Sequence, residues 1–252
     1  MVLVKTFYAH NELRNFSYAI TDQDSGFTWV IDPYDSSVFK DYIQKNGLVL
    51  KGILNTHRHH DHIRGNSGLI EAFGTSVQIF RNNQTIDLGH HHSIEVMDTP
   101  GHTKDHQVFI WKKGQGTECL FSGDSLFNAG VGNCHGGGDV SELYDSTCLL
   151  KQLDDSTLLY PGHDYRLKNL SFAQSLEPEN KLIAEKLKEL DEYQSEHLPP
   201  VTLREEKMVN PFLRLQSKEI RQKVLVETLG LSENNVSDRE LFKYLRLMRD
   251  QW

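Results

Sequence analysis

Cysteine is scarce in this sequence of 252 residues, which has only Cys119, Cys134 and Cys148. Their number is odd and no two are spaced as CxxC, so the sequence indicates neither a disulfide framework nor a cysteine zinc site. Basic charge is also in deficit, because 27 Lys and Arg stand against 35 Asp and Glu, for a formal net charge of -8. A phosphate backbone attracts a basic surface. We therefore expect no nucleic-acid partner, and we disfavour a metallo-nuclease.

Long apolar runs are lacking as well. No stretch approaches the length of a membrane span, and the first 16 residues, MVLVKTFYAHNELRNF, lack the basic-then-apolar order of a signal peptide. We therefore expect a reduced, cytoplasmic protein with no membrane partner, acting as a monomer. A chain of this length can bury a sizeable core in one large or two smaller domains.

Strand-like runs dominate the chain up to about residue 165. They are rich in aromatic and β-branched residues and end at Asp, Pro, Asn or Gly; they cover 16–22, 27–33, 48–56, 76–80, 86–100, 106–112 and 118–124. Residues 36–47 have helical spacing, with Ser36 or Ser37 expected to cap the start and Gly47 the end. Helical periodicity then takes over, in 169–176, 178–194, 218–230 and 238–252. The pattern predicts a layered α/β domain over 1–165 and a helical domain over 166–252.

Histidine is abundant, with thirteen residues, and four of them lie in the stretch NTHRHHDHIRG. His57 and His59 are two apart, so in extended backbone their side chains leave on the same side. Asp61 and His62 follow, where the chain turns toward a helix. Four ligands this close cannot converge on one tetrahedral ion without strain. The spacing therefore favours two adjacent ions, and imidazole with carboxylate suits zinc, iron or manganese.

Three further ligands each follow a strand-like run and have a glycine before them. They are His102 in DTPGHT, Asp124 in LFSGDS and His163 in LYPGHD. A glycine lets the backbone turn sharply and present the side chain. We expect one ion to be held by His57, His59 and His102, and the other by Asp61, His62 and His163, with Asp124 shared between them. We expect zinc, with iron or manganese as alternatives.

This pattern of HxHxDH, then GH, GD and GH, resembles the metallo-β-lactamase superfamily. The stretches TPGHTKDH, FSGDSLFNAG, PGHDYRLKNLSFAQSLEPEN and TLREEKMVNPFLR are most similar to glyoxalase II, the hydroxyacylglutathione hydrolases. The resemblance implies an αββα sandwich followed by a helical substrate-binding domain. It also implies a substrate, S-(2-hydroxyacyl)glutathione, typically S-D-lactoylglutathione.

Such a two-metal site would hydrolyse a thioester. A hydroxide bridging the two ions would attack the carbonyl while a metal takes up charge on the oxyanion. A thiolate leaves readily, since its conjugate acid has a pKa of about 8.5. Asp61 and Asp124 are the candidate catalytic residues, and for Asp61 we favour the role of ligand over that of local base.

Several nearby residues have weaker assignments. Thr56 and Thr103 either orient metal histidines or simply favour strand ends, and we expect His106 to be structural. His60 is expected to point to solvent, and the triple from His90 to His92 to form a solvated hairpin turn.

The resemblance also implies a glutathione site. Tyr165, Arg246 and Arg249 match positions that bind the tripeptide, and two guanidinium groups could grip its glycine carboxylate. Asn133 and His135 stand where the family has a basic residue and a tyrosine, and three glycines follow. We expect hydrolysis to be retained and glutathione binding to be weaker or altered, so that His135→Ala would lower substrate affinity.

Other functions fit parts of this pattern. A hydrolase of the same fold could act on a different thioester or a lactone. A persulfide dioxygenase with a single iron is less favoured, because such relatives usually lack the long helical end that contains NPFLR. Outside the enzymes, a thiol- or metal-binding protein that has lost activity would need a decayed site, whereas all seven ligands are present.

Overall fold

The computed structural model describes residues 1–192, 199–228, 230 and 236–252. The chain forms two compact units. The first comprises 1–98, 105–123 and 160–164, and the second 99–104, 124–159 and 165–252. Each unit is built from segments that are distant in sequence, so the predicted boundary between 165 and 166 stays a prediction.

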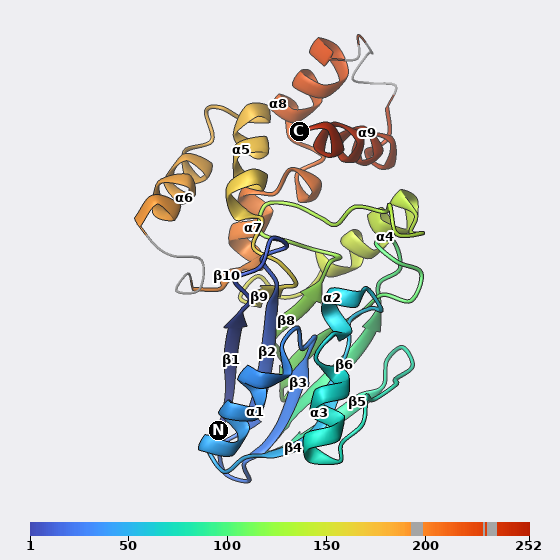
Figure 1. The fold of residues 1–252 in the computed structure, drawn as a ribbon. Helices are drawn as coiled ribbons and strands as arrows, with labels where there is room; N and C mark the ends of the chain where they lie inside the picture. The colour runs from blue at the N-terminus through green and yellow to red at the C-terminus, as the bar shows by residue number, and fades with distance from the viewer. Residues whose placement is uncertain (193–198, 229, 231–235) are drawn as a thin grey trace. The chain divides into compact units, whose positions relative to one another are not determined.

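The first sheet belongs to the first unit and has the strand order β1-β2-β3-β4 (Figure 1). Its strands are β1 (Val2–Tyr8), β2 (Phe16–Asp22), β3 (Phe27–Ile31) and β4 (Val49–Leu54). β3 and β4 are parallel, because α1 (Ser36–Lys45) provides the crossover between them. All seven residues of β2 are buried, as expected for a strand covered on both faces.

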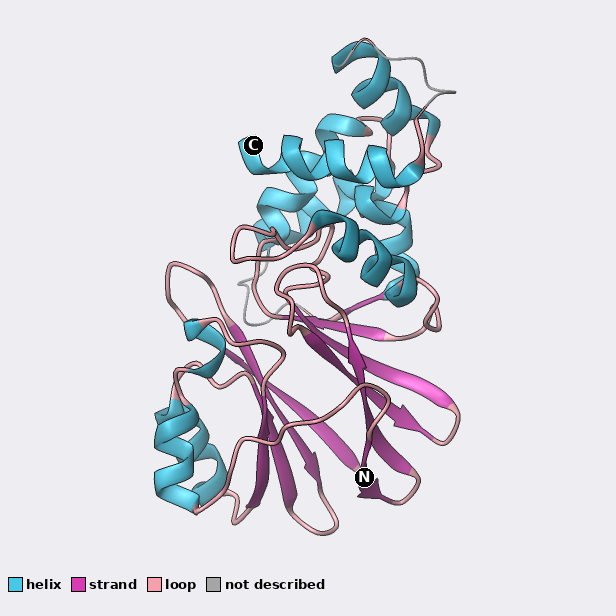
Figure 2. Cartoon of the chain, turned by 90° about the vertical axis from the view of Figure 1, so that its right-hand side faces the viewer, coloured by secondary structure: helices cyan, strands magenta, loops and turns pink. Residues whose placement is uncertain are grey.

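Helices α1 and α3 (Asn66–Phe73) cover one face of this sheet. Phe39 and Ile43 of α1 and Leu69 of α3 pack with Val30 and Ile53 of the strands in one buried cluster. The opposite face meets the second sheet, where the Tyr18 ring lies 5.3 Å from those of Phe121 and Tyr160. Figure 2 shows the two sheets as separate layers. The loops that bear the predicted metal ligands follow strands of these sheets.

The second sheet has the order β10-β9-β8-β7-β6-β5. Its strands are β5 (Thr85–Gly89), β6 (His92–Asp98), β7 (Gln107–Lys113), β8 (Gly116–Gly123), β9 (Leu158–Pro161) and β10 (Val201–Thr202). The pairings from β5 to β8 are antiparallel.

Helices make up most of the second unit. They are α4 (Val140–Leu150), α5 (Arg166–Leu176), α6 (Lys181–Glu192), α7 (Leu203–Val209), α8 (Lys218–Arg221) and α9 (Asp238–Gln251), with a π-helical segment at Gln222–Thr228. Capping boxes begin α7 at Thr202 and α9 at Ser237. Each satisfies two of the backbone N–H groups that a helix start leaves without a partner.

The elements differ from the sequence expectations in several places, and α4, α7 and β10 were not anticipated. Asp35, not Ser36 or Ser37, caps α1 by accepting a hydrogen bond from Ser37 N. Residues 76–80 form no strand, and only Val77 makes an isolated bridge, to Ile53. β1, whose burial alternates weakly, was not anticipated. The last two residues of the expected helix 178–194 lie outside the described residues.

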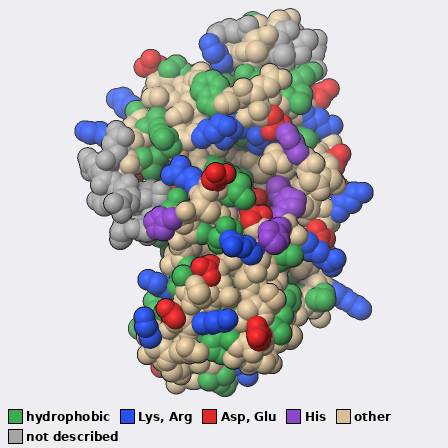
Figure 3. Space-filling model, in the orientation of Figure 1, with side chains coloured by type: hydrophobic (Ala, Val, Ile, Leu, Met, Phe, Trp, Pro, Cys, Tyr) green, Lys and Arg blue, Asp and Glu red, His purple; other side chains and the backbone are tan. Residues whose placement is uncertain are grey.

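The surface carries charges of both signs. On the face drawn in Figure 3, acidic and basic side chains are interspersed. Within the described ranges, no helix is both long and apolar enough to cross a membrane.

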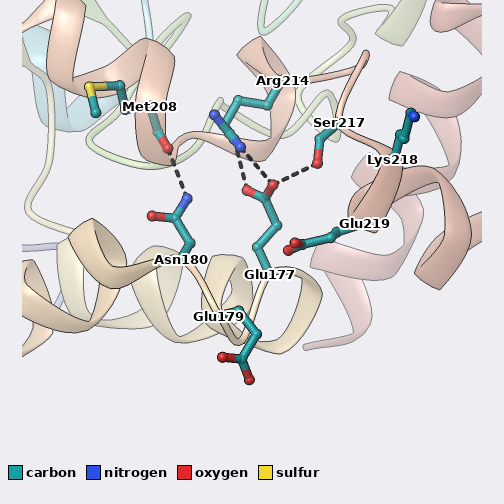
Figure 4. A pocket seen from close by; sticks show the side chains of 8 residues that line it. All are labelled: Glu177, Glu179, Asn180, Met208, Arg214, Ser217, Lys218 and Glu219. Carbon is teal, nitrogen blue, oxygen red and sulfur yellow. Dashed lines mark hydrogen bonds and ion pairs between the residues drawn. The ribbon is translucent and has the colours of Figure 1, made fainter.

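Glu177, directly after α5, has a buried carboxylate that joins two segments of the second unit. Glu177 is 2 % exposed, and both of its oxygens accept hydrogen bonds from Arg214, at 2.7 and 2.8 Å (Figure 4). Ser217 Oγ adds a third at 2.6 Å. Burial by itself would raise the pKa of Glu177, but the bonds from Arg214 and Ser217 outweigh it and leave the pKa below its ordinary value.

Glu177→Gln is expected to destabilise the protein by about 3 kcal/mol at pH 7, because it leaves a partly buried guanidinium without its counter-charge. The folded-state pKa is depressed, so the stabilisation is present above the unfolded pKa of about 4.3 and is lost as pH falls through the folded value. Denaturant unfolding at pH 7 and pH 3.5 measures this. The exposed neighbour Glu179 is the matched control, and equal losses for Glu177→Gln and Glu179→Gln would contradict the prediction.

Candidate functional site

Five of the seven predicted metal ligands lie in the first unit, at the ends of strands. His57 and His59 follow β4, and the short helix α2 (His60–Ile63) carries Asp61 and His62 in its first turn. His163 follows β9. His57, His62 and His163 are each no more than 3 % exposed. His60 is exposed, as predicted.

A buried carboxylate that sequence reasoning missed organises this group. Asp32, at the end of β3, accepts hydrogen bonds from Thr56 N at 2.7 Å, Thr56 Oγ1 at 2.6 Å and His62 Nδ1 at 2.9 Å. Because the Thr56 hydroxyl donates its only hydrogen to Asp32, it must accept from His57 Nδ1, 3.0 Å away. Thr56 thus takes the orienting role. Asp32 therefore leaves Nε2 of both His57 and His62 as the unprotonated nitrogen.

His163 is set in the same way by a backbone carbonyl. Its Nδ1 lies 2.8 Å from Leu13 O, which can only accept, so Nε2 carries the lone pair. That Nε2 is 3.2 Å from His62 Nε2, and Asp61 Oδ2 is 3.4 Å from both. Nitrogens about 2.0–2.1 Å from a tetrahedral zinc are about 3.3 Å apart. Two facing lone pairs beside a carboxylate thus match the donor set of a divalent cation.

A second pair of nitrogens faces one another nearby. His57 Nε2 and His59 Nδ1 are 3.0 Å apart, again close to the spacing of two ligands on one ion. His106 stacks on the His57 ring with centroids 5.0 Å apart, which is a packing contact. Asn15, buried and also missed from sequence, donates from Nδ2 to Asp61 Oδ2 at 2.8 Å. This bond fixes the orientation of the Asp61 carboxylate beside His62 and His163.

The remaining two predicted ligands lie together in the second unit. His102 Nε2 is 3.4 Å from Asp124 Oδ2. His102 Nδ1 lies 2.6 Å from the Asn133 carbonyl, which assigns the lone pair to Nε2. Gly132 permits this close packing, because a Cβ there would lie 2.0 Å from Asp124 O and 3.1 Å from His102 Nδ1. The loop that follows β8 thus positions both ligands.

A cavity of about 310 Å3 in the second unit contains four of the five predicted substrate residues. Asn133, Tyr165, Arg246 and Arg249 line it. Lys168 and Asp250 line it too, and neither was singled out from sequence. His135 is not among the lining residues; its side chain is 71 % exposed, and its Nε2 lies 3.3 Å from Asp250 Oδ2.

The two arginines of this cavity are not equivalent. Arg246 is 5 % exposed and donates from Nη1 to Val131 O at 2.7 Å and Gly132 O at 3.2 Å, and from Nη2 to Asp250 at 3.0 Å. Arg249 donates from Nε and Nη2 to Asn169 Oδ1, at 3.1 and 2.9 Å. Burial lowers the pKa of both, and for Arg249 the charge of Arg246 lowers it further. Even so, arginine stays protonated in proteins.

Two other sequence motifs have structural explanations. His90 and His91 form the expected turn, with φ of 52° and 64°, but His92 begins β6, is 8 % exposed and accepts a hydrogen bond from Trp111 Nε1. The solvated-turn prediction is therefore wrong for His92. Burial raises the pKa of the Cys134 thiol to about 11, so the thiol stays protonated and unreactive.

Comparison with known proteins agrees with this architecture. The sequence model of the metallo-beta-lactamase superfamily matches residues 11–81 and 74–163, and that of the hydroxyacylglutathione hydrolase C-terminus matches 164–252. The structure of ETHE1 from Myxococcus xanthus is similar in fold, with a TM-score of 0.64 and 24% identity over 98% of each chain. The fold is thus the metallo-β-lactamase fold with a C-terminal helical region.

Two relatives are similar to this chain over nearly its full length. A hydroxyacylglutathione hydrolase of Francisella philomiragia is 36% identical over 99% of both chains. One of Polaromonas is 35% identical over 100% of both. With both family models matched in sequence order along one chain, this protein belongs to the hydroxyacylglutathione hydrolase (glyoxalase II) family of enzymes in the metallo-β-lactamase superfamily.

Proposed function

We propose that this protein hydrolyses S-(2-hydroxyacyl)glutathione thioesters, typically S-D-lactoylglutathione, to a 2-hydroxy acid and glutathione. The observation that carries the proposal is the pair of lone-pair nitrogens on His62 and His163, 3.2 Å apart beside Asp61. Membership in a family of thioester hydrolases supplies the substrate class.

We infer that the chain holds two divalent metal ions. His57, His59 and His102 would bind one, Asp61, His62 and His163 the other, and Asp124 both. The neighbouring donor atoms of His57 with His59, of Asp61, His62 and His163, and of His102 with Asp124 support this assignment. Zinc is the ion we propose, with iron or manganese as alternatives, because the same ligands accept all three. The protein would act in the cytoplasm as a monomer.

Bound there, two divalent ions would supply a hydroxide nucleophile near neutral pH and a Lewis acid for the thioester carbonyl. Asp32 and Thr56 keep the His57 and His62 rings in the tautomer that presents Nε2. Asn15 fixes the orientation of the Asp61 carboxylate by donating to Oδ2.

The leaving group needs little help from the protein. A thiolate whose conjugate acid has a pKa of about 8.5 departs without a strong general acid, and none is required from the side chains of the cavity. The cationic residues of the second unit would hold the glutathione portion while the acyl carbonyl reacts.

The direct test is steady-state hydrolysis of S-D-lactoylglutathione by protein of measured metal content. We expect about two metal ions per chain and release of equimolar D-lactate and glutathione. Stripping by a chelator should abolish turnover, and zinc, iron or manganese should restore it. Metal-loaded protein that leaves the thioester intact while hydrolysing a lactone or another thioester would contradict the proposed substrate.

A further inference from the structure

The 310 Å3 cavity of the second unit has an excess of positive charge. Lys168 on α5 and Arg246 and Arg249 on α9 line it, opposed by the single carboxylate of Asp250. The remaining lining residues are uncharged. A cavity with this balance favours an anion, and a small one with several polar groups suits a carboxylate.

Arg246 is occupied by the protein itself. Its two Nη atoms bond to two backbone carbonyls and to Asp250, and its side chain is almost fully buried. The carbonyls belong to Val131 and Gly132, in the loop that also packs against His102 and Asp124. Arg246 is thus a positioning residue for the loop, and its charge is compensated by Asp250.

Arg249 is oriented by an uncharged partner, and the charge of Asp250 acts on its guanidinium as well. Its partner is the amide oxygen of Asn169, which is uncharged, and Asn169 is itself fixed through Nδ2 to Asn128 O at 2.9 Å. The guanidinium is therefore presented in one orientation. Its remaining N–H groups can donate to a ligand.

Lys168 is the third cation and the most available one. It neighbours Asn169 on α5, its side chain is exposed, and it lines the cavity. Among the described residues, none forms an ion pair or hydrogen bond with its ammonium group. A solvated ammonium at the edge of a cavity can swing onto an incoming anion at little desolvation cost.

We propose that Lys168, with Arg249, binds the glycine carboxylate of the glutathione portion of the substrate, and that Lys168 thereby determines specificity for glutathione thioesters. This inference rests on the proposed function and deepens it. It divides the three cations by role, since Arg246 fixes the loop while Lys168 and Arg249 contact the substrate.

The test compares Lys168→Ala with the wild type on two substrates. One is S-D-lactoylglutathione, and the other is the same thioester with its glycine carboxylate converted to the amide. On the free acid, Lys168→Ala should raise KM about tenfold, typical of one charge-assisted hydrogen bond, with kcat within about twofold. On the amide the wild type should already show the raised KM, and Lys168→Ala should add little.

Two control variants make the result specific. Lys168→Arg should keep most of the affinity, since it retains the charge. Lys188→Ala removes an exposed lysine of α6 in the same unit, away from the cavity, and should leave both substrates unaffected. An unchanged KM for Lys168→Ala on the free acid would overturn the inference, as would an equal rise on both substrates. If instead the wild type hydrolyses neither substrate, the proposed function itself fails.

Discussion

Asp32→Asn is expected to lower kcat/KM for thioester hydrolysis by at least a hundredfold and to weaken metal retention by a similar factor. Groups that hydrogen-bond to metal-binding histidines typically contribute 10–100-fold each. Asp32 acts on two predicted ligands, on His62 through Nδ1 and on His57 through Thr56. Three donors converge on its carboxylate. An asparagine has one acceptor oxygen, so its amide nitrogen would face another donor.

The substitution suits the backbone, because Asp32 has a φ of 48° and asparagine tolerates that region. Metal affinity by chelator competition, together with kcat/KM, measures the effect apart from folding. Asp35→Ala is the matched control: it removes a nearby carboxylate that only caps α1 and should cost about 1 kcal/mol of stability with metal binding intact. Full metal affinity in Asp32→Asn would refute the role given to Asp32.

Gly132→Ala is expected to reduce kcat/KM by about a hundredfold, because a displacement of about 1 Å near the reacting groups has an effect of that size. The new Cβ would lie 2.0 Å from the Asp124 carbonyl oxygen, which is backbone and cannot rotate away. The loop must therefore shift, and it carries Asp124 and the carbonyl that orients His102. Overpacking should also cost about 1–3 kcal/mol of stability.

Gly116→Ala is the control for this variant. Gly116 begins β8, and an added Cβ there would have only an ordinary contact, 3.7 Å from Lys113 O. Activity assays on Gly132→Ala and Gly116→Ala, with metal content measured alongside, test whether the loop shift lowers kcat/KM. Wild-type turnover in Gly132→Ala would show that the loop can relax without moving the ligands.

The candidate metal ligands could be singled out from sequence because their identity and spacing are local properties. HxHxDH occupies six consecutive residues, and each later candidate ligand follows a strand-like run and a glycine. These residues could therefore be recognised from the sequence pattern alone. Strands such as β2 were predictable for a similar reason, since their apolar runs are continuous. The two-ion assignment of these ligands stays a prediction.

The residues that hold the ligands were not predictable in the same way. Asp32 is one acidic residue among 35, and its importance comes from contacts with residues 24 and 30 positions away. Arg246 was predicted to bind the substrate, and its bonds to carbonyls more than 110 positions distant could not be predicted. Lys168 was overlooked because an exposed lysine on a helix has no distinctive pattern. Long-range pairing of this kind leaves no periodicity in the sequence.

The bond from His163 to the Leu13 carbonyl joins residues 150 positions apart, and Asn15 pairs with His163 as an isolated bridge. Because the cost of closing a chain segment must be met before such contacts form, we expect the candidate cation-binding group of Asp61, His62 and His163 to be completed late in folding. During synthesis, His57 to His62 emerge about a hundred residues before their partner. Metal capture should therefore report on completed folding rather than initiate it. Shortened chains ending before residue 163 should bind metal poorly although all four HxHxDH ligands are present.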